Sequence, residues 1–203
     1  MMSTIDGPSR RRTASAGRRG VRGVSEPPAS LPPPVRPDTV FLDRDGTINV
    51  RAPVGDYVKT WDEFQFLPGA PEAIRGLADE GIRVIVVTNQ RGIARGLMTA
   101  ANLDEIHARM LDELAGAVSA VYYCPHDEGA CDCRKPRTGM FVRAAHQFPE
   151  IELARSAVIG DSAVDVEAAR AVGALAVLVG PPCDADADIT APSLADAVAL
   201  LLD

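Results

Sequence analysis

The chain has 203 residues, of which 46% are hydrophobic and 24% are charged, and its formal net charge is -7. Length and composition are typical of one soluble globular domain, and no apolar run reaches the roughly 18 residues that a membrane span requires. Residues 1–37 hold seven arginines against two acidic residues, a net charge of +5, which leaves -12 for residues 38–203. A domain with that charge repels nucleic-acid phosphates, so nucleic-acid binding is not expected.

Residues 1–37 differ in composition from the rest of the chain. They consist mainly of Arg, Ser, Gly and Pro, with almost no large apolar residues. Such a segment cannot bury enough surface to offset the entropy of ordering it, so we predict a disordered tail, or a start codon assigned too far upstream. No apolar stretch follows Arg11 and Arg12, so an export signal is not expected and a cytoplasmic location is predicted.

From residue 38 onward, short apolar runs alternate with helical patterns, which predicts one domain over residues 38–203. The predicted strands cover residues 40–42, 84–87, 121–123, 158–159 and 175–179. The predicted helices cover residues 71–80, 99–114, 140–147, 165–172 and 194–202. Strands separated by helices favour an α/β fold, a doubly wound parallel sheet with right-handed crossovers. The two histidines in helical stretches, His107 and His146, are expected to be solvated or half-buried.

Polar residues follow the ends of several predicted strands. Asp43 and Asp45 come directly after the first strand, Thr88 ends the second, and Asp161 follows the fourth. Lys135 lies in the loop before the fourth strand. Because the carboxyl ends of parallel strands meet at one edge of a sheet, these side chains are expected to converge there. Acids for Mg²⁺, a hydroxyl for phosphate oxygens and a fixed cation form the set that phosphoryl transfer needs.

A second constellation contains three thiols and one imidazole within ten residues. Its members are Cys124, His126, Cys131 and Cys133. The competing interpretation, a disulfide between Cys131 and Cys133, would close a strained ring in a chain expected to stay reduced. The set predicts a structural zinc site whose four ligands leave no place for water. We expect this zinc to position Arg134 and Lys135, which follow directly. Cys183 is expected to be a surface thiol.

From about Thr39 to Val179 the chain resembles the haloacid dehalogenase superfamily of phosphatases. The resemblance implies that Asp43 is the nucleophile and that Asp45 is the general acid and base, with its carbonyl on Mg²⁺. It implies that Thr88 binds the transferring phosphoryl group, that Lys135 neutralises it, and that Asp161, supported by Asp165, completes the Mg²⁺ site made with Asp43 and Asp45. The chain between the first two strands is too short for a large cap domain.

The motifs together resemble the D-glycero-D-manno-heptose 1,7-bisphosphate 7-phosphatase group, which makes activated heptose for cell-envelope glycans. The matching segments are Asp43–Asn49, Gly55–Val58, Thr88–Gly96, Cys124–His126, Cys131–Pro136 and Gly160–Asp165. The resemblance implies a small phosphorylated sugar as substrate. It implies substrate contacts at Asn89, Gln90, Arg95, Arg134 and Lys135.

Two alternatives stay open from the sequence. The short gap between His126 and Cys131 is closer to the related histidinol-phosphate phosphatases, whereas the Gly-Ile-Ala-Arg-Gly segment at residues 92–96 favours heptose. A non-catalytic phosphate-binding relative is the other alternative, although no catalytic position of the motif set is missing. The oligomeric state cannot be derived from the sequence, and a monomer is favoured.

Overall fold

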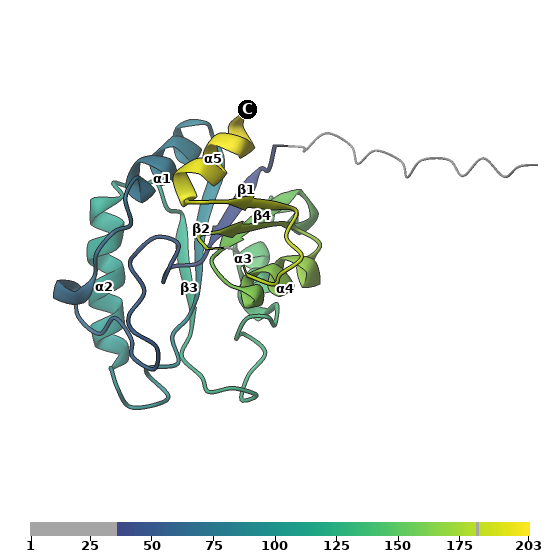
Figure 1. Ribbon diagram of the computed structural model, residues 1–203. Helices are drawn as coiled ribbons and strands as arrows, with labels where there is room; N and C mark the ends of the chain where they lie inside the picture. Colours follow the sequence, from purple (N-terminus) through teal and green to yellow (C-terminus); the bar gives the residue numbers. More distant parts are fainter. Residues whose placement is uncertain (1–35, 182) are drawn as a thin grey trace, which may run out of the picture. The chain divides into compact units, whose positions relative to one another are not determined.

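The computed structural model describes residues 36–181 and 183–203 (Figure 1). Residues 1–35, which hold nearly all of the predicted disordered tail, lie outside the described residues, so that prediction stays untested. None of the described helices combines the length and the apolar character that a membrane span needs.

One sheet of six parallel strands forms the centre of the domain. The strands lie in the order β3-β2-β1-β4-β5-β6. Their bounds are β1 Thr39–Leu42, β2 Arg83–Asn89, β3 Ala120–Cys124, β4 Ser156–Gly160, β5 Leu175–Val179 and β6 Ile189–Ala191. Within the sheet, Val40 of β1 lies opposite Val84 of β2 and Ala157 of β4. All four residues of β1 are buried, as expected of a strand covered on both faces.

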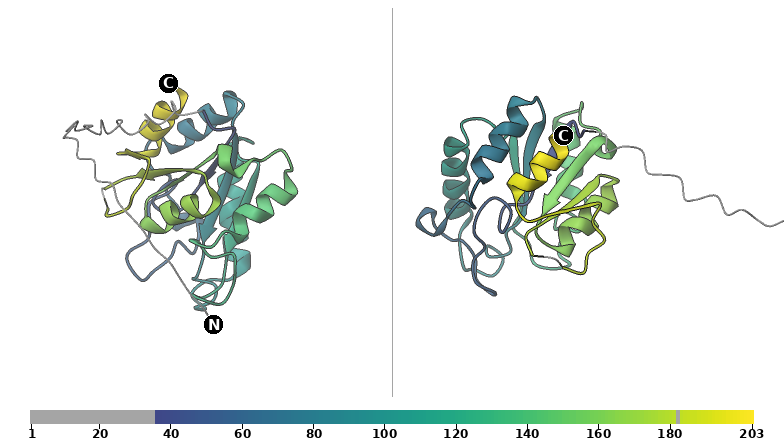
Figure 2. Two further views of the ribbon diagram at one scale, coloured as in Figure 1. Left: turned by 90° about the vertical axis from the view of Figure 1, so that its right-hand side faces the viewer. Right: turned by 45° about the horizontal axis from the view of Figure 1, so that its top comes forward.

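Helices cover both faces of this sheet (Figures 1 and 2). Their bounds are α1 Ala70–Asp79, α2 Ala100–Glu113, α3 Gly139–Gln147, α4 Ala163–Val172 and α5 Leu194–Leu202. Successive strand residues point to opposite faces, so Val40 and Leu42 pack in one apolar cluster with α1, α2 and α5. Phe41 packs in the other cluster with α3 and α4, where its ring meets Phe141 edge to face at 5.1 Å. The domain therefore has three layers.

Local sequence signals set the ends of several helices. Thr99 caps α2, because its hydroxyl accepts from the Asn102 backbone N–H while the Asn102 side chain accepts from the Thr99 backbone. Ser193 caps α5 through its hydroxyl, which accepts from the Asp196 backbone N–H. Gly173 ends α4 with φ of 73°, a left-handed conformation that favours glycine.

The observed architecture confirms the predicted doubly wound α/β fold. The sixth strand, β6, was not predicted, because its three residues carry no apolar run or alternation long enough to indicate a strand. Between β1 and β2 the chain forms a loop, the short 3₁₀ helix η1 (Trp61–Glu63) and α1, so no cap domain lies there. A second 3₁₀ turn, η2 (Leu153–Arg155), precedes β4.

The strand order determines where the sheet is open to a ligand. The chain passes from β1 to β2 on one side, and β4 later pairs with β1 on the other side. Where the connections that follow two neighbouring strands run in opposite directions, a crevice forms at the carboxyl ends of these strands, a place called the switch point of the sheet. The carboxyl end of β1 is followed at once by Asp43 and Asp45.

Candidate active site

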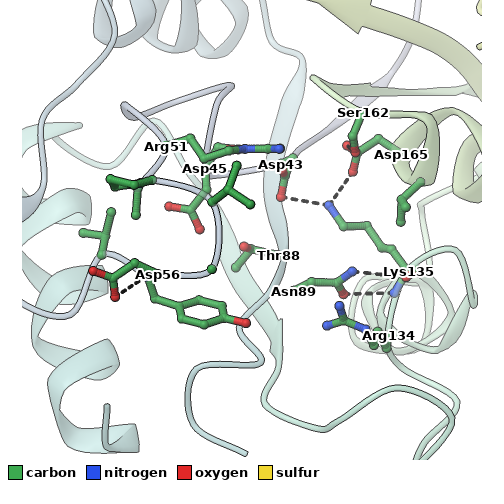
Figure 3. A pocket seen from close by; sticks show the side chains of 17 residues that line it. Asp43, Asp45, Arg51, Asp56, Thr88, Asn89, Arg134, Lys135, Ser162 and Asp165 are labelled. Atoms are coloured by element: carbon green, nitrogen blue, oxygen red, sulfur yellow. Dashed lines mark hydrogen bonds and ion pairs between the residues drawn. The ribbon is translucent and has the colours of Figure 1, made fainter. Parts of the chain in front are cut away.

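The carboxylates of Asp43 and Asp165 meet the ammonium group of Lys135 at the end of β1 (Figure 3), and the carboxylate of Asp161 lies close to both acids. Lys135 Nζ donates to Asp43 Oδ1 at 2.8 Å, to Asp165 Oδ1 at 2.6 Å and to the backbone carbonyl of Val87 at 2.8 Å. Asp165 lies in the first turn of α4, while Asp161 follows β4. Lys135 is only 4% exposed, so its charge is held in place beneath the cavity.

The electrostatics of this cluster follow from one ammonium group shared between two buried acids. Burial, together with the charges of Asp165 and Asp45, raises the pKa of Asp43 to about 7 even though Lys135 opposes the change. Burial also raises the pKa of Asp161 to about 6 against the opposing charge of Arg51. Burial disfavours the charge of Lys135, but the two carboxylates outweigh it and raise the pKa of its ammonium group. The cluster therefore favours an additional cation.

Asp45 lies in a different environment from Asp43. Its carboxylate accepts from Arg44, from Asn49 Nδ2 at 3.0 Å and from Gln90 Nε2 at 2.7 Å. Burial alone would raise its pKa, but the charge of Arg44 and these hydrogen bonds outweigh burial and lower the pKa. Two carboxylates two residues apart thus differ in pKa, a difference that suits two different chemical roles.

A cavity of about 400 Å³ opens above these groups. One wall is the loop of residues 51–58, and the other holds Arg134 and Ser162 (Figure 3). Val164 also lines the cavity. From the loop, Arg51 forms an ion pair with Asp161 and reaches the backbone carbonyl of Asp45 at 3.3 Å. Gly46, with φ of 93°, lies so close to Asp161 that a side chain there would collide with the carboxylate.

The donor atoms at this site fit a magnesium ion. Oxygens of Asp43, Asp161 and Asp165 all lie within 4.8 Å of one another. Mg²⁺ prefers oxygen ligands and commonly takes one or two carboxylates together with substrate phosphate and water. Both oxygens of Asp165 already accept hydrogen bonds, Oδ1 from Lys135 and Oδ2 from the Ser162 hydroxyl, whereas Lys135 engages only Oδ1 of Asp43. Asp43, Asp161 and the carbonyl of Asp45 are therefore the better candidates for the ion.

The remaining predicted site residues have different positions. Thr88 is 1% exposed and borders the cavity beside Asn89. The Asn89 side chain is bonded to the backbone N–H and carbonyl of Lys135, at 3.0 and 3.1 Å, and so supports the lysine. Arg134 borders the cavity, whereas Arg95 is exposed and does not line it.

Two predicted side-chain environments need correction. Gln90, predicted as a substrate contact, is fully buried and donates to Asp45 and Thr88. His107, expected to be solvated or half-buried, is 6% exposed and contacts Arg44. His107 shares a helical face with the apolar residues Leu103 and Met110, and this spacing was a signal for burial. His146 is exposed, as expected.

Arg51 and the ion pair between the buried Arg44 and Asp45 were not predicted from the sequence. Nothing in the sequence indicates that Arg51 lies opposite Asp161, 110 residues away. Arg44 stands between two acids in the motif, but its complete burial depends on α2 covering it.

The predicted zinc ligands lie together at the end of β3. Their ligand atoms are all within 4.8 Å of one another. Sγ of Cys124 lies 3.4 Å from Sγ of Cys131, and Nδ1 of His126 lies 3.3 Å from Sγ of Cys133. Tetrahedral zinc with Zn–S bonds of about 2.3 Å places neighbouring ligands about 3.8 Å apart, so the set fits this ion. All four cysteines of the chain are free thiols, and Cys183 is exposed.

The fold and the site together define a phosphoric monoester hydrolase. The model of the haloacid dehalogenase-like hydrolase family matches residues 21–173. A D-glycero-beta-D-manno-heptose-1,7-bisphosphate 7-phosphatase of Pseudomonas putida is 47% identical over 145 residues, which are 69% of this chain and 81% of that protein. The corresponding alpha enzyme of Mycobacterium tuberculosis is 42% identical over 141 residues, 68% of this chain and 74% of that one.

A solved structure agrees with these relatives. D,D-heptose 1,7-bisphosphate phosphatase from B. bronchiseptica, complexed with magnesium and phosphate, superposes with a TM-score of 0.72 at 34% identity, over 81% of this chain and 97% of that one. The chain belongs to the haloacid dehalogenase-like hydrolase family. The predicted resemblance to the heptose bisphosphate phosphatase group is confirmed as well.

Proposed function

We propose that this protein is a Mg²⁺-dependent phosphatase that removes the 7-phosphate of D-glycero-D-manno-heptose 1,7-bisphosphate through an aspartyl-phosphate intermediate. The observation that carries the proposal is the position of Asp43 at the switch point of the sheet, 2.8 Å from Lys135 Nζ and beside Asp161. Relatives that are 40% to 47% identical to this chain are named heptose-1,7-bisphosphate 7-phosphatases, and these names support the sugar substrate. Both anomers occur among the names, so the anomer is left to experiment.

In the first step, a carboxylate oxygen of Asp43 attacks the phosphorus of the 7-phosphate. The bond between phosphorus and the sugar oxygen breaks, and Asp45 gives that oxygen a proton. Lys135 and the Thr88 hydroxyl stabilise the charge on the transferring phosphoryl oxygens.

In the second step, Asp45 takes a proton from water as the water oxygen attacks the phosphorus. The bond between phosphorus and the Asp43 oxygen then breaks, which releases inorganic phosphate, restores the Asp43 carboxylate and leaves Asp45 protonated. The lowered pKa of Asp45 suits this base role directly. The proton that Asp45 takes from water is the one that it gives to the sugar oxygen in the first step of the next turnover. Mg²⁺ held by Asp43, Asp161 and the Asp45 carbonyl would supply positive charge for the phosphoryl oxygens.

A second metal belongs to the proposal in a structural role. Zinc held by Cys124, His126, Cys131 and Cys133 would pin the loop that leads into Arg134 and Lys135. Arg134 borders the cavity and, with Arg51 on the opposite wall, offers positive charge to the second phosphate of the substrate. Thiol ligands persist where cysteines stay reduced, so a cytoplasmic location is part of the proposal. A monomeric state is also part of the proposal.

The test is phosphate release with Mg²⁺ on both anomers of heptose 1,7-bisphosphate and on histidinol phosphate. We expect kcat/KM to favour a heptose bisphosphate by at least about a hundredfold, or roughly 2.7 kcal/mol of transition-state binding. Asp43→Asn is the blank, because a carboxamide cannot form the phosphoenzyme. Preference for histidinol phosphate would refute the substrate assignment, and turnover by Asp43→Asn would refute the mechanism.

A further inference from the structure

Arg44 lies between the two active-site acids but has no access to the cavity. Its side chain is 0% exposed and is the largest fully buried side chain among the described residues. Arg44 Nη2 donates to both carboxylate oxygens of Asp45 at 2.9 Å, and Nε donates to Oδ1 at 3.3 Å. A guanidinium holds a carboxylate in this way with a defined orientation, because its donors form a rigid fork. The contact through which the Arg44 side chain reaches the catalytic groups is therefore the one with Asp45.

His107 holds the other end of the Arg44 guanidinium. Its Nε2 lies 3.2 Å from Arg44 Nη1, and its ring packs 5.8 Å from the ring of Tyr123. Because a guanidinium can only donate, Nε2 must be the acceptor, and the ring proton must lie on Nδ1. Burial and the neighbouring charge of Arg44 lower the pKa of His107 to about 3, which keeps the ring neutral and able to accept. The chain of contacts therefore runs from α2 through His107 and Arg44 to Asp45.

We propose that Arg44 and His107 are positioning residues that orient the Asp45 carboxylate for proton transfer to and from the substrate. The inference rests on the proposed function, because that function makes Asp45 the acid and base. Asp45 is otherwise held by two neutral amides, those of Asn49 and Gln90. Without an acceptor at position 107, Arg44 Nη1 would be buried and unpaired, so the guanidinium would shift to find a partner and move the carboxylate with it. Misplacing a catalytic group by about 1 Å can cost about a hundredfold in rate.

A purely structural role for this pair makes a different prediction. If Arg44 and His107 only filled the space behind the site, their loss would impair every substrate alike. Orientation of Asp45 matters in the first step only when the leaving oxygen needs a proton. A sugar phosphate has a poor alkoxide leaving group and needs that proton, whereas p-nitrophenyl phosphate leaves as a stabilised phenolate and does not. The dependence on the leaving group therefore separates positioning from general support.

The experiment compares His107→Leu, which removes the acceptor, with His107→Gln, which keeps an acceptor oxygen. Rapid-quench single turnovers with Mg²⁺ measure phosphoenzyme formation from heptose 1,7-bisphosphate and the burst of nitrophenol from p-nitrophenyl phosphate. For His107→Leu we expect at least a tenfold loss on the sugar ester, a KM within twofold of wild type, and a nitrophenol burst rate within twofold of wild type. His107→Gln should recover the sugar reaction to within about threefold. His146→Leu, an exposed histidine on α3, is the matched control and should change neither rate.

Three outcomes would overturn the proposal. Equal loss on both esters would assign the pair a structural role, and no loss on either would show that Asp45 does not depend on it. Failure of His107→Gln to recover the rate would exclude the acceptor as the cause. If His107→Leu does not fold, Arg44→Lys, which keeps the charge but loses the fork, is subject to the same comparison. Failure of the proposed function itself would appear in the wild-type protein, as absence of a phosphoenzyme from either ester.

Discussion

Asp43→Asn is expected to make the fold more stable at alkaline pH while it abolishes turnover. Asp43 is 7% exposed and shares one ammonium group with Asp165. Its pKa rises from 3.8 to about 7, and at about 1.4 kcal/mol for each pH unit the ionised carboxylate costs the folded chain about 4 kcal/mol. An amide accepts a weaker hydrogen bond from Lys135 than a carboxylate does, which reduces the gain. We therefore expect an increase of about 2 to 4 kcal/mol in the free energy of unfolding at pH 8 without added Mg²⁺.

The size of this increase in the free energy of unfolding depends on pH. A carboxyl group whose pKa is raised in the folded state binds its proton more tightly there than in the unfolded chain. Its stabilising contribution is therefore present below about pH 4 and is lost as the pH rises through about 7. Replacing Asp43 by Asn removes this loss. The difference in the free energy of unfolding between the variant and the wild type should therefore be largest at pH 8 and should shrink toward pH 4.

Urea unfolding measures this difference. Trp61 is the only tryptophan, and it stacks on Phe64 at 4.9 Å, so its fluorescence reports unfolding. The measurements are made at pH 8 and at pH 5. The matched control is Asp112→Asn, which replaces an exposed acid on α2 and should leave the urea midpoint nearly unchanged at either pH. If Asp43→Asn destabilised the protein to the same degree at pH 8 and pH 5, the carboxylate would be stabilised by Lys135 and not strained by burial, and the reasoning would be wrong.

Further predictions concern the metals, the loop and the N-terminal segment. Added Mg²⁺ should raise Tm in calorimetry more at pH 8 than at pH 5, because Asp43 and Asp161, with pKa values of about 7 and about 6, are charged only at the higher pH; an equal increase at both would contradict this. Cys131→Ser should lower Tm and raise KM together, and unchanged kinetics in protein verified to lack zinc would exclude a positioning role for the metal. Arg51→Gln should tighten Mg²⁺ binding in titration calorimetry, because Arg51 pairs with Asp161, a candidate ligand of the ion. The gain should be at most about fivefold, since an ion pair with an exposed side chain is worth at most about 1 kcal/mol, and weaker binding would show that Arg51 does not compete with the ion. Deletion of residues 1–36 should leave kcat/KM unchanged, since in the described part of that segment Arg36 contacts Glu80 through an exposed ion pair and a hydrogen bond to its backbone carbonyl, away from the cavity. Loss of turnover would make the segment part of the enzyme.

Several features could be predicted from the sequence because they depend on residues close together in the chain. Alternating apolar runs and helical patterns indicate a doubly wound sheet, and acids directly after a strand must lie at its carboxyl end. The grouping of Cys124, His126, Cys131 and Cys133 was predictable for the same reason, because ten residues of loop can only spread their side chains over a short distance. The strand β6 was missed because three residues carry too little pattern.

Other features were decided by tertiary packing. Lys135 contacts Asp43 across 92 residues and Asp165 across 30, and Arg51 contacts Asp161 across 110. Whether such side chains meet depends on strand order and loop path, which no local spacing encodes. Burial acts in the same way on individual residues. His107 accepts from Arg44 because α2 packs against the end of β1 in one particular register. The sequence by itself therefore determined which chemical groups are present and at which edge of the sheet they lie. The tertiary structure alone decided their partners, their burial and hence their pKa values, because desolvation and charge pairing depend on groups that are distant in the chain.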